Sequence, residues 1–147
     1  MQIQCSWEEK MRFRAGDDRF QISMDGKPPF GDASALSPKQ LLLASVCGCT
    51  GMDVVALLRK YKQSVEKFDV HAEANLTEGA YPVIFKSIIL RFKLLGNIDA
   101  DRLIEAVTLS QTKYCGVSAM VSKAVQIFYS IELNGVSIHE GQSHFQF

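Results

Sequence analysis

Apolar and polar residues alternate in two segments near the middle of the chain. The apolar positions of the first segment are Phe68, Val70, Ala72, Ala74 and Leu76. In the second segment, residues 83–96, one face carries Ile88, Leu90, Phe92 and Leu94. A period of two predicts strands with one buried and one solvated face. Because the intervening TEGAYP supplies a turn, we expect the two strands to pair as a hairpin.

The N-terminal third combines short strands with the start of a long helix. Residues 2–24 contain short alternating segments, which predict a small antiparallel meander. Residues 27–36 are rich in Pro, Gly and small side chains and suit a surface loop. A helix should then begin at Pro38, which has no N–H to lose at a first helical position. Ser37 and Gln40 have the spacing of a capping box.

The C-terminal half predicts two further helices and two strands. Asp99 or Asp101 opens a helix that should end near Tyr114. A short helix from about Ser118 leads into a strand within residues 124–133, whose alternate residues are apolar. An Asn-Gly turn and one short strand close the chain. Together these elements predict an α+β fold.

Composition narrows the classes of function. The chain has 147 residues, which is the usual size of one domain, so we expect a single domain over residues 1–147. Sixteen basic and sixteen acidic residues give a net charge of zero without a basic block, which argues against nucleic acid as a partner. No apolar run is expected to reach the roughly 18 residues of a membrane span, and no signal peptide is recognisable. We therefore expect a cytoplasmic protein that has no membrane partner and whose four cysteines are reduced.

The long helix is apolar or small on every face. Apart from two cysteines, its only ionisable residue between Leu41 and Leu58 is Asp53. We therefore expect the helix to be buried on all sides. Gly48 and Gly51 each cost about 1 kcal/mol of helix propensity relative to Ala. Such glycines are typical of a helix that another backbone approaches, in this chain or in a second subunit.

Cys47 and Cys49 lie two residues apart in this helix, so their side chains point to nearly opposite sides. They cannot share a metal ion or form a disulfide with each other. We expect no metal site, because the chain has no Cys-x-x-Cys pair and its histidines lack ligand spacing. Asp53 lies one turn after Cys49 on the same face and needs a partner if it is buried; a structural ion pair is the simplest role.

Two segments together resemble a known family. SPKQLLLASVCGCTGMDVV, residues 37–55, is similar to the proline-initiated cysteine helix of the OsmC/Ohr family, the osmotically inducible protein C and organic hydroperoxide resistance proteins. KYCGVS, residues 113–118, resembles the segment around the second cysteine of that family. The resemblance covers roughly residues 1–134 and is strongest to the less characterised OsmC-like members. It aligns Cys49 and Cys115 with the two family cysteines, whereas Cys5 and Cys47 have no counterpart.

The resemblance implies a fold and a chemistry. The fold would be an intertwined α+β homodimer in which antiparallel sheets wrap long central helices. The chemistry would be that of a thiol peroxidase, in which Cys49 reduces an organic hydroperoxide and Cys115 resolves the sulfenic acid as a disulfide. No bound cofactor is implied, and an external dithiol, of lipoyl type or another, would restore both thiols.

The resemblance also implies a group that activates the thiol, because burial in an apolar helix disfavours a thiolate. Family enzymes use an arginine from the N-terminal meander, held by a glutamate that follows the proline of the helix. Arg14 is our candidate for the arginine, with a solvated strand residue as its alternative role. Lys39 and Gln40 stand where the acidic residue is expected, and neither is acidic. Both are counted as further candidates for thiolate activation, and Lys39 would act as a cation if its side chain folds inward. Asp53 and Tyr114 are candidates for the lining of the pocket.

Three functions are consistent with these observations. The first is a hydroperoxide reductase that uses Cys49 and Cys115. The second is a noncatalytic protein that binds a lipid-like or acyl ligand in the same apolar pocket. The third is a redox sensor that is oxidised without sustained turnover. The two cysteines in their motifs favour the first function, and the missing acidic residue after Pro38 keeps the second open.

Overall fold

The computed structural model describes residues 1–79 and 81–146, so Ala80 of the predicted turn lies outside the described part of the chain. The backbone contacts divide the chain into two compact units, Met1–Ala44 and Ser45–Phe147. Its N-terminal strands are β1 (Gln4–Glu9), β2 (Arg12–Gly16) and β3 (Gln21–Met24), and the helix α1 (Pro38–Lys60) follows them. The later elements are β4 (Ser64–Leu76), β5 (Phe85–Asn97), α2 (Ala100–Leu109), the π-helix η1 (Ser110–Tyr114), α3 (Gly116–Ser122), β6 (Gln126–Leu133) and β7 (Val136–Gln142).

The N-terminal unit contains the predicted meander. β1, β2 and β3 form an antiparallel sheet in that order, which confirms the prediction. The loop after β3 is organised by Asp25, whose carboxylate accepts hydrogen bonds from the backbone N–H groups of Gly26, Asp32 and Ser34 and from the Ser34 hydroxyl. These bonds, led by those from Ser34, lower the pKa of Asp25 to about 2 because they stabilise the carboxylate.

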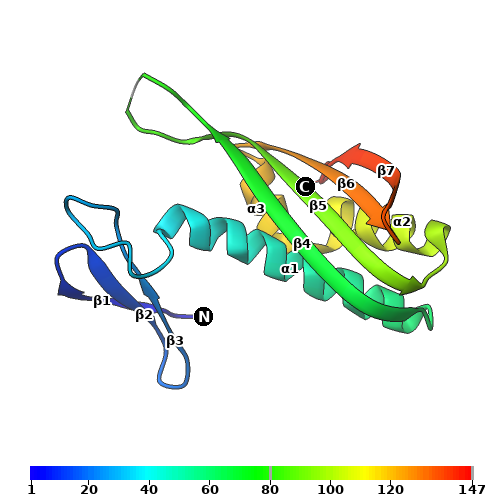
Figure 1. Cartoon of the computed structure of the whole chain (residues 1–147), viewed down its shortest axis with the longest axis horizontal. Helices are drawn as coiled ribbons and strands as arrows, with labels where there is room; N and C mark the ends of the chain where they lie inside the picture. The colour runs from blue at the N-terminus through cyan, green and yellow to red at the C-terminus, as the bar shows by residue number, and fades with distance from the viewer. Residues whose placement is uncertain (80, 147) are drawn as a thin grey trace. The chain divides into compact units, whose positions relative to one another are not determined.

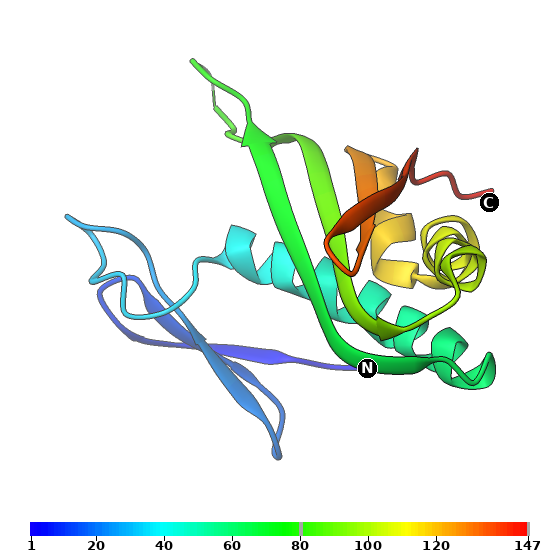
Figure 2. The same ribbon diagram turned by 45° about the vertical axis from the view of Figure 1, so that its right-hand side comes forward.

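The larger unit is built on a four-stranded sheet in the order β4-β5-β6-β7 (Figure 1). β4 and β5 pair antiparallel from Ser64 to Leu76, so the predicted hairpin is confirmed. The alternating apolar residues of β5 and β6 lie side by side and are buried. Their register pairs are Ile88 with Ile127, Leu90 with Tyr129, Phe92 with Ile131, and Leu94 with Leu133. These pairs are the sheet's part of the core, to which α1 and α2 also contribute buried residues, and α2 and α3 lie on one face of the sheet (Figure 2).

β5 and β6 run parallel, so the expectation of purely antiparallel sheets is wrong at this pairing. Parallel neighbours need a long crossover connection, and α2, η1 and α3 supply it. Asp99 caps α2 through a bond from the backbone N–H of Arg102, as the sequence predicts. α3 begins at Gly116, slightly before the predicted start. The crossover runs from the end of β5 at Asn97 to the opposite end of the sheet, where β6 begins at Gln126, and it carries Cys115 between η1 and α3.

α1 begins as predicted. The side-chain oxygen of Gln40 accepts from the Ser37 backbone N–H at 2.8 Å, and the Gln40 N–H points back to the Ser37 hydroxyl at 3.4 Å. The expectation that α1 is buried on all sides is wrong for the single chain. Its buried residues recur every four positions as one stripe of Val46, Thr50, Val54 and Leu58. The rest of the helix is apolar without being covered by its own chain, and Met52 is 75% exposed.

The same helix corrects the expectation that no segment is apolar enough to span a bilayer. An 18-residue window of α1 has a mean hydropathy of 2.0, which suffices by length and composition alone. Core helices of soluble proteins meet the same criterion, so one such helix is weak evidence for a span. A surface covered by another protein subunit accounts equally well for this composition.

Asp25 makes the N-terminal unit sensitive to acid. Its folded-state pKa of about 2 lies below the ordinary value of 3.8, so the unfolded chain takes up the proton first as the pH falls. The stabilising contribution of Asp25 is therefore complete above about pH 4 and is lost toward pH 2. We expect Asp25→Asn to reduce the loss of stability in this window, as followed by denaturant unfolding with the fluorescence of Trp7 in β1 as probe. The exposed Asp18→Asn is the control, and an unchanged acid profile in Asp25→Asn would contradict the assignment.

Candidate functional site

Two thiols and a carboxylate meet between α1 and the start of α3. Cys49 and Asp53 are one turn apart on α1, and Cys115 is the residue before α3. The sulfur atoms of both cysteines and a carboxylate oxygen of Asp53 lie within 4.8 Å of one another. Cys115 is fully buried, whereas Cys49 and Asp53 are half-buried. The structure thus brings together the two cysteines of the sequence motifs, and both are free thiols.

The backbone around Cys115 places its sulfur. The chain leaves η1 at Cys115, where ψ changes to 97°, and the Cys115 N–H still donates to the Ser110 carbonyl. The Sγ atom then accepts a hydrogen bond from the Ser118 N–H at 3.3 Å and so caps α3. A π-helical turn is uncommon and often occurs at functional sites. Here it displaces the end of the α2–η1 helix and points the thiol toward α1.

Buried hydrogen bonds connect α1 to η1 beside the thiols. The Thr50 and Ser110 hydroxyls are 2.8 Å apart, and Ser110 donates to Asp53 Oδ2 at 3.0 Å. Gln111 Nε2 donates to Thr50 at 2.7 Å, and Gln111 Oε1 accepts from Ser143 at 2.6 Å. We call Thr50, Ser110, Gln111 and Ser143 the polar clamp. Because Thr50 follows Cys49 directly, the clamp fixes the part of α1 that carries the first thiol.

The sequence analysis did not identify the polar clamp. The available signal was weak: Thr50, Ser110 and Gln111 are polar residues within otherwise apolar helical stretches. A buried polar side chain needs a partner, so such positions could have been flagged as pairing with one another. Every buried side-chain polar atom within the described residues has a hydrogen-bond partner.

Burial dominates the electrostatics of the cluster. It raises the pKa of Cys115 to about 11, an effect that the neighbouring Cys49 thiol reinforces and the hydrogen bonds from Ser118 oppose. Burial also raises the pKa of Asp53, and the hydrogen bond from Ser110 partly offsets it. The predicted ion pair of Asp53 is replaced by this hydroxyl contact. Cys115 is therefore a protonated thiol at neutral pH.

Cys47 lies on a different side of α1 from Cys49. It lines an apolar groove of about 550 Å³ between α1 and β4, together with Gly48, Gly51, Met52, Val55, Ala56, Arg59, Phe68 and Val70. Burial raises the pKa of the Cys47 thiol. Cys5 is exposed on β1. Neither of these thiols belongs to the cluster of Cys49 and Cys115.

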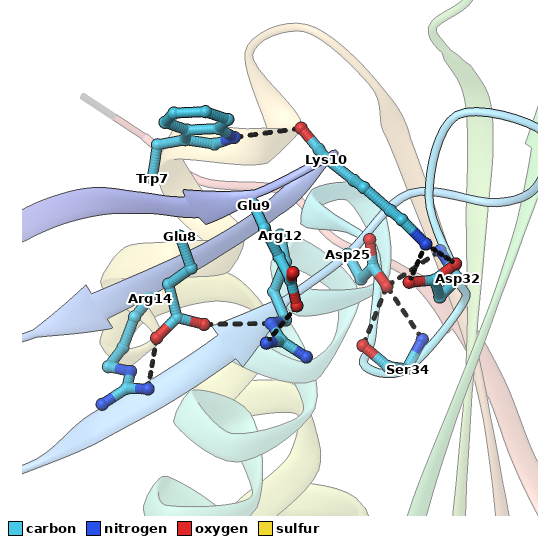
Figure 3. Close-up of polar contacts among 9 residues, drawn as sticks. All are labelled: Trp7, Glu8, Glu9, Lys10, Arg12, Arg14, Asp25, Asp32 and Ser34. Carbon is cyan, nitrogen blue, oxygen red and sulfur yellow. Dashed lines mark hydrogen bonds and ion pairs between the residues drawn. The ribbon is translucent and has the colours of Figure 1, made fainter.

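Arg14 lies in the N-terminal unit and has a carboxylate partner there (Figure 3). Its guanidinium pairs with Glu8 of β1, and Glu8 also accepts from Arg12 Nε at 3.0 Å. Two arginines of β2 thus converge on one glutamate of the neighbouring strand. The resemblance placed an acidic partner of the arginine after Pro38, and nothing in the sequence pointed to the pair with Glu8, because strand register decides which side chains meet.

The other predicted site residues have local roles in the structure. Gln40 uses its side-chain oxygen in the helix cap with Ser37. Lys39 is exposed in the first turn of α1. Tyr114 ends η1 and is 48% exposed, with the Lys113 ammonium 5.4 Å from the centre of its ring.

The family model for OsmC-like proteins matches residues 31–130, which include α1, the crossover helices and both clustered cysteines. The chain belongs to the OsmC-like family. This membership confirms the resemblance found in the sequence and the α+β fold that it implied.

Relatives of this OsmC-like protein cover almost its whole length. Protein YhfA of Escherichia coli K12 is 37% identical over 135 residues, which are 90% of this chain and 98% of YhfA. The crystal structure of a hypothetical protein from Aquifex aeolicus has a TM-score of 0.80 at 27% identity and covers 90% of this chain and 95% of its own. An organic hydroperoxide resistance protein OsmC from Legionella pneumophila has a TM-score of 0.64 at 14% identity, over 88% and 94% of the two chains, and shows the shared fold.

The polar clamp can be tested by removing one hydroxyl. Thr50→Val keeps the side-chain shape but removes the bond to the Ser110 hydroxyl and the shorter of the two bonds of the Gln111 amide, leaving that amide only the 3.5 Å contact with the Ser118 hydroxyl. We expect a loss of about 1–3 kcal/mol in the free energy of unfolding, the cost of a buried polar group that loses its partner. Urea unfolding at a fixed protein concentration measures this loss. Thr112→Val is the matched control, because its hydroxyl bonds only the Thr108 carbonyl of its own helix. Equal stability of the two variants would contradict the role of the clamp.

Proposed function

We propose that this protein is a thiol peroxidase that reduces organic hydroperoxides. The observation that carries the proposal is the approach of the Cys49 and Cys115 sulfur atoms to within 4.8 Å, from separate helices and without an existing bond. A disulfide needs sulfur atoms that can move to about 2 Å from each other, which side-chain rotation can achieve from this distance. The relationship to proteins that include an organic hydroperoxide resistance protein supports the same chemistry.

The proposed reaction has three steps. The Cys49 thiolate attacks the terminal oxygen of the hydroperoxide, the O–O bond breaks, and the alkoxide leaves and is protonated to an alcohol. The sulfenic acid at Cys49 then reacts with Cys115, forming the S–S bond and releasing water. An external dithiol, of lipoyl type or another, reduces this disulfide by thiol–disulfide exchange and is itself oxidised.

Exposure supports the assignment of the two roles. Cys49 is half-buried, so a small hydroperoxide has access to it, whereas Cys115 is fully buried behind it. Cys115 therefore suits a resolving thiol that meets only an oxidised neighbour. In this scheme Asp53 accepts the proton that Cys115 loses as the disulfide forms, because its carboxylate oxygen is within the same 4.8 Å. The apolar surroundings favour alkyl hydroperoxides over hydrogen peroxide.

The proposal assigns Arg14 as the cation that stabilises the attacking thiolate. The pairing with Glu8 supports this role, because a carboxylate that holds a guanidinium reduces its freedom and orients it. Glu8 would then be the acidic side chain that holds the arginine, which neither Lys39 nor Gln40 after Pro38 can be. Lys39 is the other candidate cation.

We also propose that the active protein is a cytoplasmic homodimer. The outer face of α1 supports this inference, since it is too apolar for a surface that faces water. Met52 is 75% exposed, and the groove of about 550 Å³ runs along the same face. A second copy related by a twofold axis would place its own α1 against this face of α1. The small residues Gly48 and Gly51 would allow the two helices to approach closely.

The groove on the Cys47 side of α1 also favours a second candidate function, the binding of a lipid-like ligand without turnover, although the sequence-based hypothesis placed that ligand in the pocket of Cys49. Its walls are apolar, and Arg59 at its border could pair with an acidic head group. The two functions use different sides of α1, because Cys47 lines the groove and Cys49 does not. Cysteine substitutions therefore separate them.

Turnover of an organic hydroperoxide with an external dithiol tests the proposed function. We expect Cys49→Ser to reduce turnover to the uncatalysed rate, because no thiolate remains at the attacking position. Cys115→Ser should consume one equivalent of peroxide per chain and then accumulate a sulfenic acid, detected by mass spectrometry. Cys47→Ser is the matched control and should retain wild-type turnover. A wild-type protein that does not turn over any organic hydroperoxide, or full activity in Cys49→Ser, would overturn the peroxidase assignment.

The dimer is tested by placing a charge on the outer face of α1. We expect Met52→Glu to convert a dimer of the wild type to monomers, because the interface would bury an unpaired carboxylate. Sedimentation velocity measures this change. Val136→Glu adds the same charge at an exposed position, at the start of β7, and should remain dimeric. A wild-type protein that sediments as a monomer, or a Met52→Glu variant that sediments as a dimer, would contradict the interface.

A further inference from the structure

The cluster of Cys49, Asp53 and Cys115 has the composition of a metal site as well as of a redox pair. We propose that the reduced protein binds one Zn²⁺ through the two thiolates and the Asp53 carboxylate, with water as the fourth ligand. The proposal does not depend on peroxidase activity and goes beyond it. The expectation that the chain has no metal site was based on sequence spacing, which does not reveal ligands that the fold brings together from residues 49 and 115.

The geometry suits a tetrahedral ion. Two ligands come from one helix at a separation of four residues, which places them on the same face, and the third comes from the N-cap of another helix. The three donor atoms lie within 4.8 Å of one another. With Zn–S bonds of about 2.3 Å and a Zn–O bond of about 2.0–2.2 Å, tetrahedral donors are separated by about 3.6–3.8 Å. The donor atoms therefore have to move about 1 Å closer together than the observed limit of 4.8 Å, which side-chain rotation of the half-buried Cys49 and Asp53 can achieve.

The neighbouring hydrogen bonds suit a metal site too. Ligating groups are usually held by a second layer of hydrogen-bond partners. The Ser110 hydroxyl donates to Asp53 Oδ2 and is hydrogen-bonded to the Thr50 hydroxyl, which in turn accepts from Gln111. The Ser118 N–H donates to the Cys115 sulfur and remains available to a thiolate. Two thiolates and one carboxylate match the preference of Zn²⁺ for sulfur, nitrogen and carboxylate ligands.

Zinc binding would compete directly with oxidation. Binding of Zn²⁺ to two thiols displaces two protons, forms two Zn–S bonds and leaves no free thiolate to attack a peroxide. Formation of the Cys49–Cys115 disulfide would remove two of the three protein ligands and release the ion. The metal-bound form and the disulfide form therefore exclude each other. A thiophilic cation would protect the reduced thiols and inhibit peroxide reduction reversibly.

Cobalt titration of the reduced full-length protein without oxygen tests the site. Co²⁺ in a tetrahedral thiolate site gives a thiolate-to-metal charge-transfer band and intense visible absorption, which Zn²⁺ abolishes because it binds more tightly. We expect one Co²⁺ per chain with both signals in the wild type. Cys47→Ser and Cys5→Ser should behave identically to it. Cys49→Ser and Cys115→Ser should reduce the charge-transfer band and weaken Zn²⁺ binding at least tenfold.

Asp53→Asn tests the third ligand and keeps both thiols. We expect its affinity for Zn²⁺ to fall by at least about tenfold, as in sites that lose a ligand or its support. Asp69→Asn, which removes an exposed carboxylate of β4, is the matched control and should bind as the wild type does. If Asp53→Asn does not fold, the comparison uses the reduced wild type before and after disulfide formation, and binding should disappear on oxidation.

The outcomes separate this inference from the peroxidase proposal. A reduced wild type without a charge-transfer band would overturn the zinc site, because cobalt bound only at surface histidines would not produce one. Unchanged affinity in Asp53→Asn or retention of the metal by the disulfide form would also overturn it. The titration contains no peroxide, so a protein that binds zinc but does not turn over hydroperoxides would refute only the proposed function.

Discussion

The hydrogen bonds between Thr50 of α1 and Ser110 and Gln111 of η1 are the interaction on which the site depends. They are buried, so neither helix can slide or rotate without exposing unpaired polar groups to an apolar core. The positions of both thiols follow from this constraint. Cys49 precedes Thr50, and Cys115 follows the π-helical turn that begins at Ser110. The clamp therefore positions two sulfur atoms that neither helix could bring together alone.

The environments of the two thiols differ in a way that supports the roles proposed for them. Cys115 is buried, and burial raises its pKa, which suits a thiol that meets only an oxidised neighbour in the proposed reaction. Cys49 is half-buried, so small molecules have access to it, and the Asp53 carboxylate lies beside it. In the proposed peroxide chemistry Arg14, held by Glu8, is the cation that stabilises the attacking thiolate. In the proposed metal-bound form, Zn²⁺ is the cation beside the same groups.

Local patterns in the sequence predicted the elements well. The capping box of Ser37 and Gln40, the hairpin of β4 and β5, and the Asp99 cap are all interactions between near neighbours along the chain or along paired strands. The parallel pairing of β5 and β6 and the polar clamp depend on contacts across about 30 to 60 residues, which periodicity does not encode. The apolar composition of α1 predicted a helix buried on all sides, whereas the chain itself buries only one stripe of the helix. The motifs pointed to Cys49 and Cys115, but the roles of Glu8 and Ser110 required strand register and helix contacts.

The central claim is that Cys49 and Cys115 form a single redox unit. Treatment of the reduced protein with one equivalent of an organic hydroperoxide, followed by peptide mass spectrometry of its disulfides, tests it most directly. We expect a rapid Cys49–Cys115 linkage, with Cys5 and Cys47 still as thiols. Four unmodified thiols after prolonged exposure, or a linkage that involves Cys47, would contradict it.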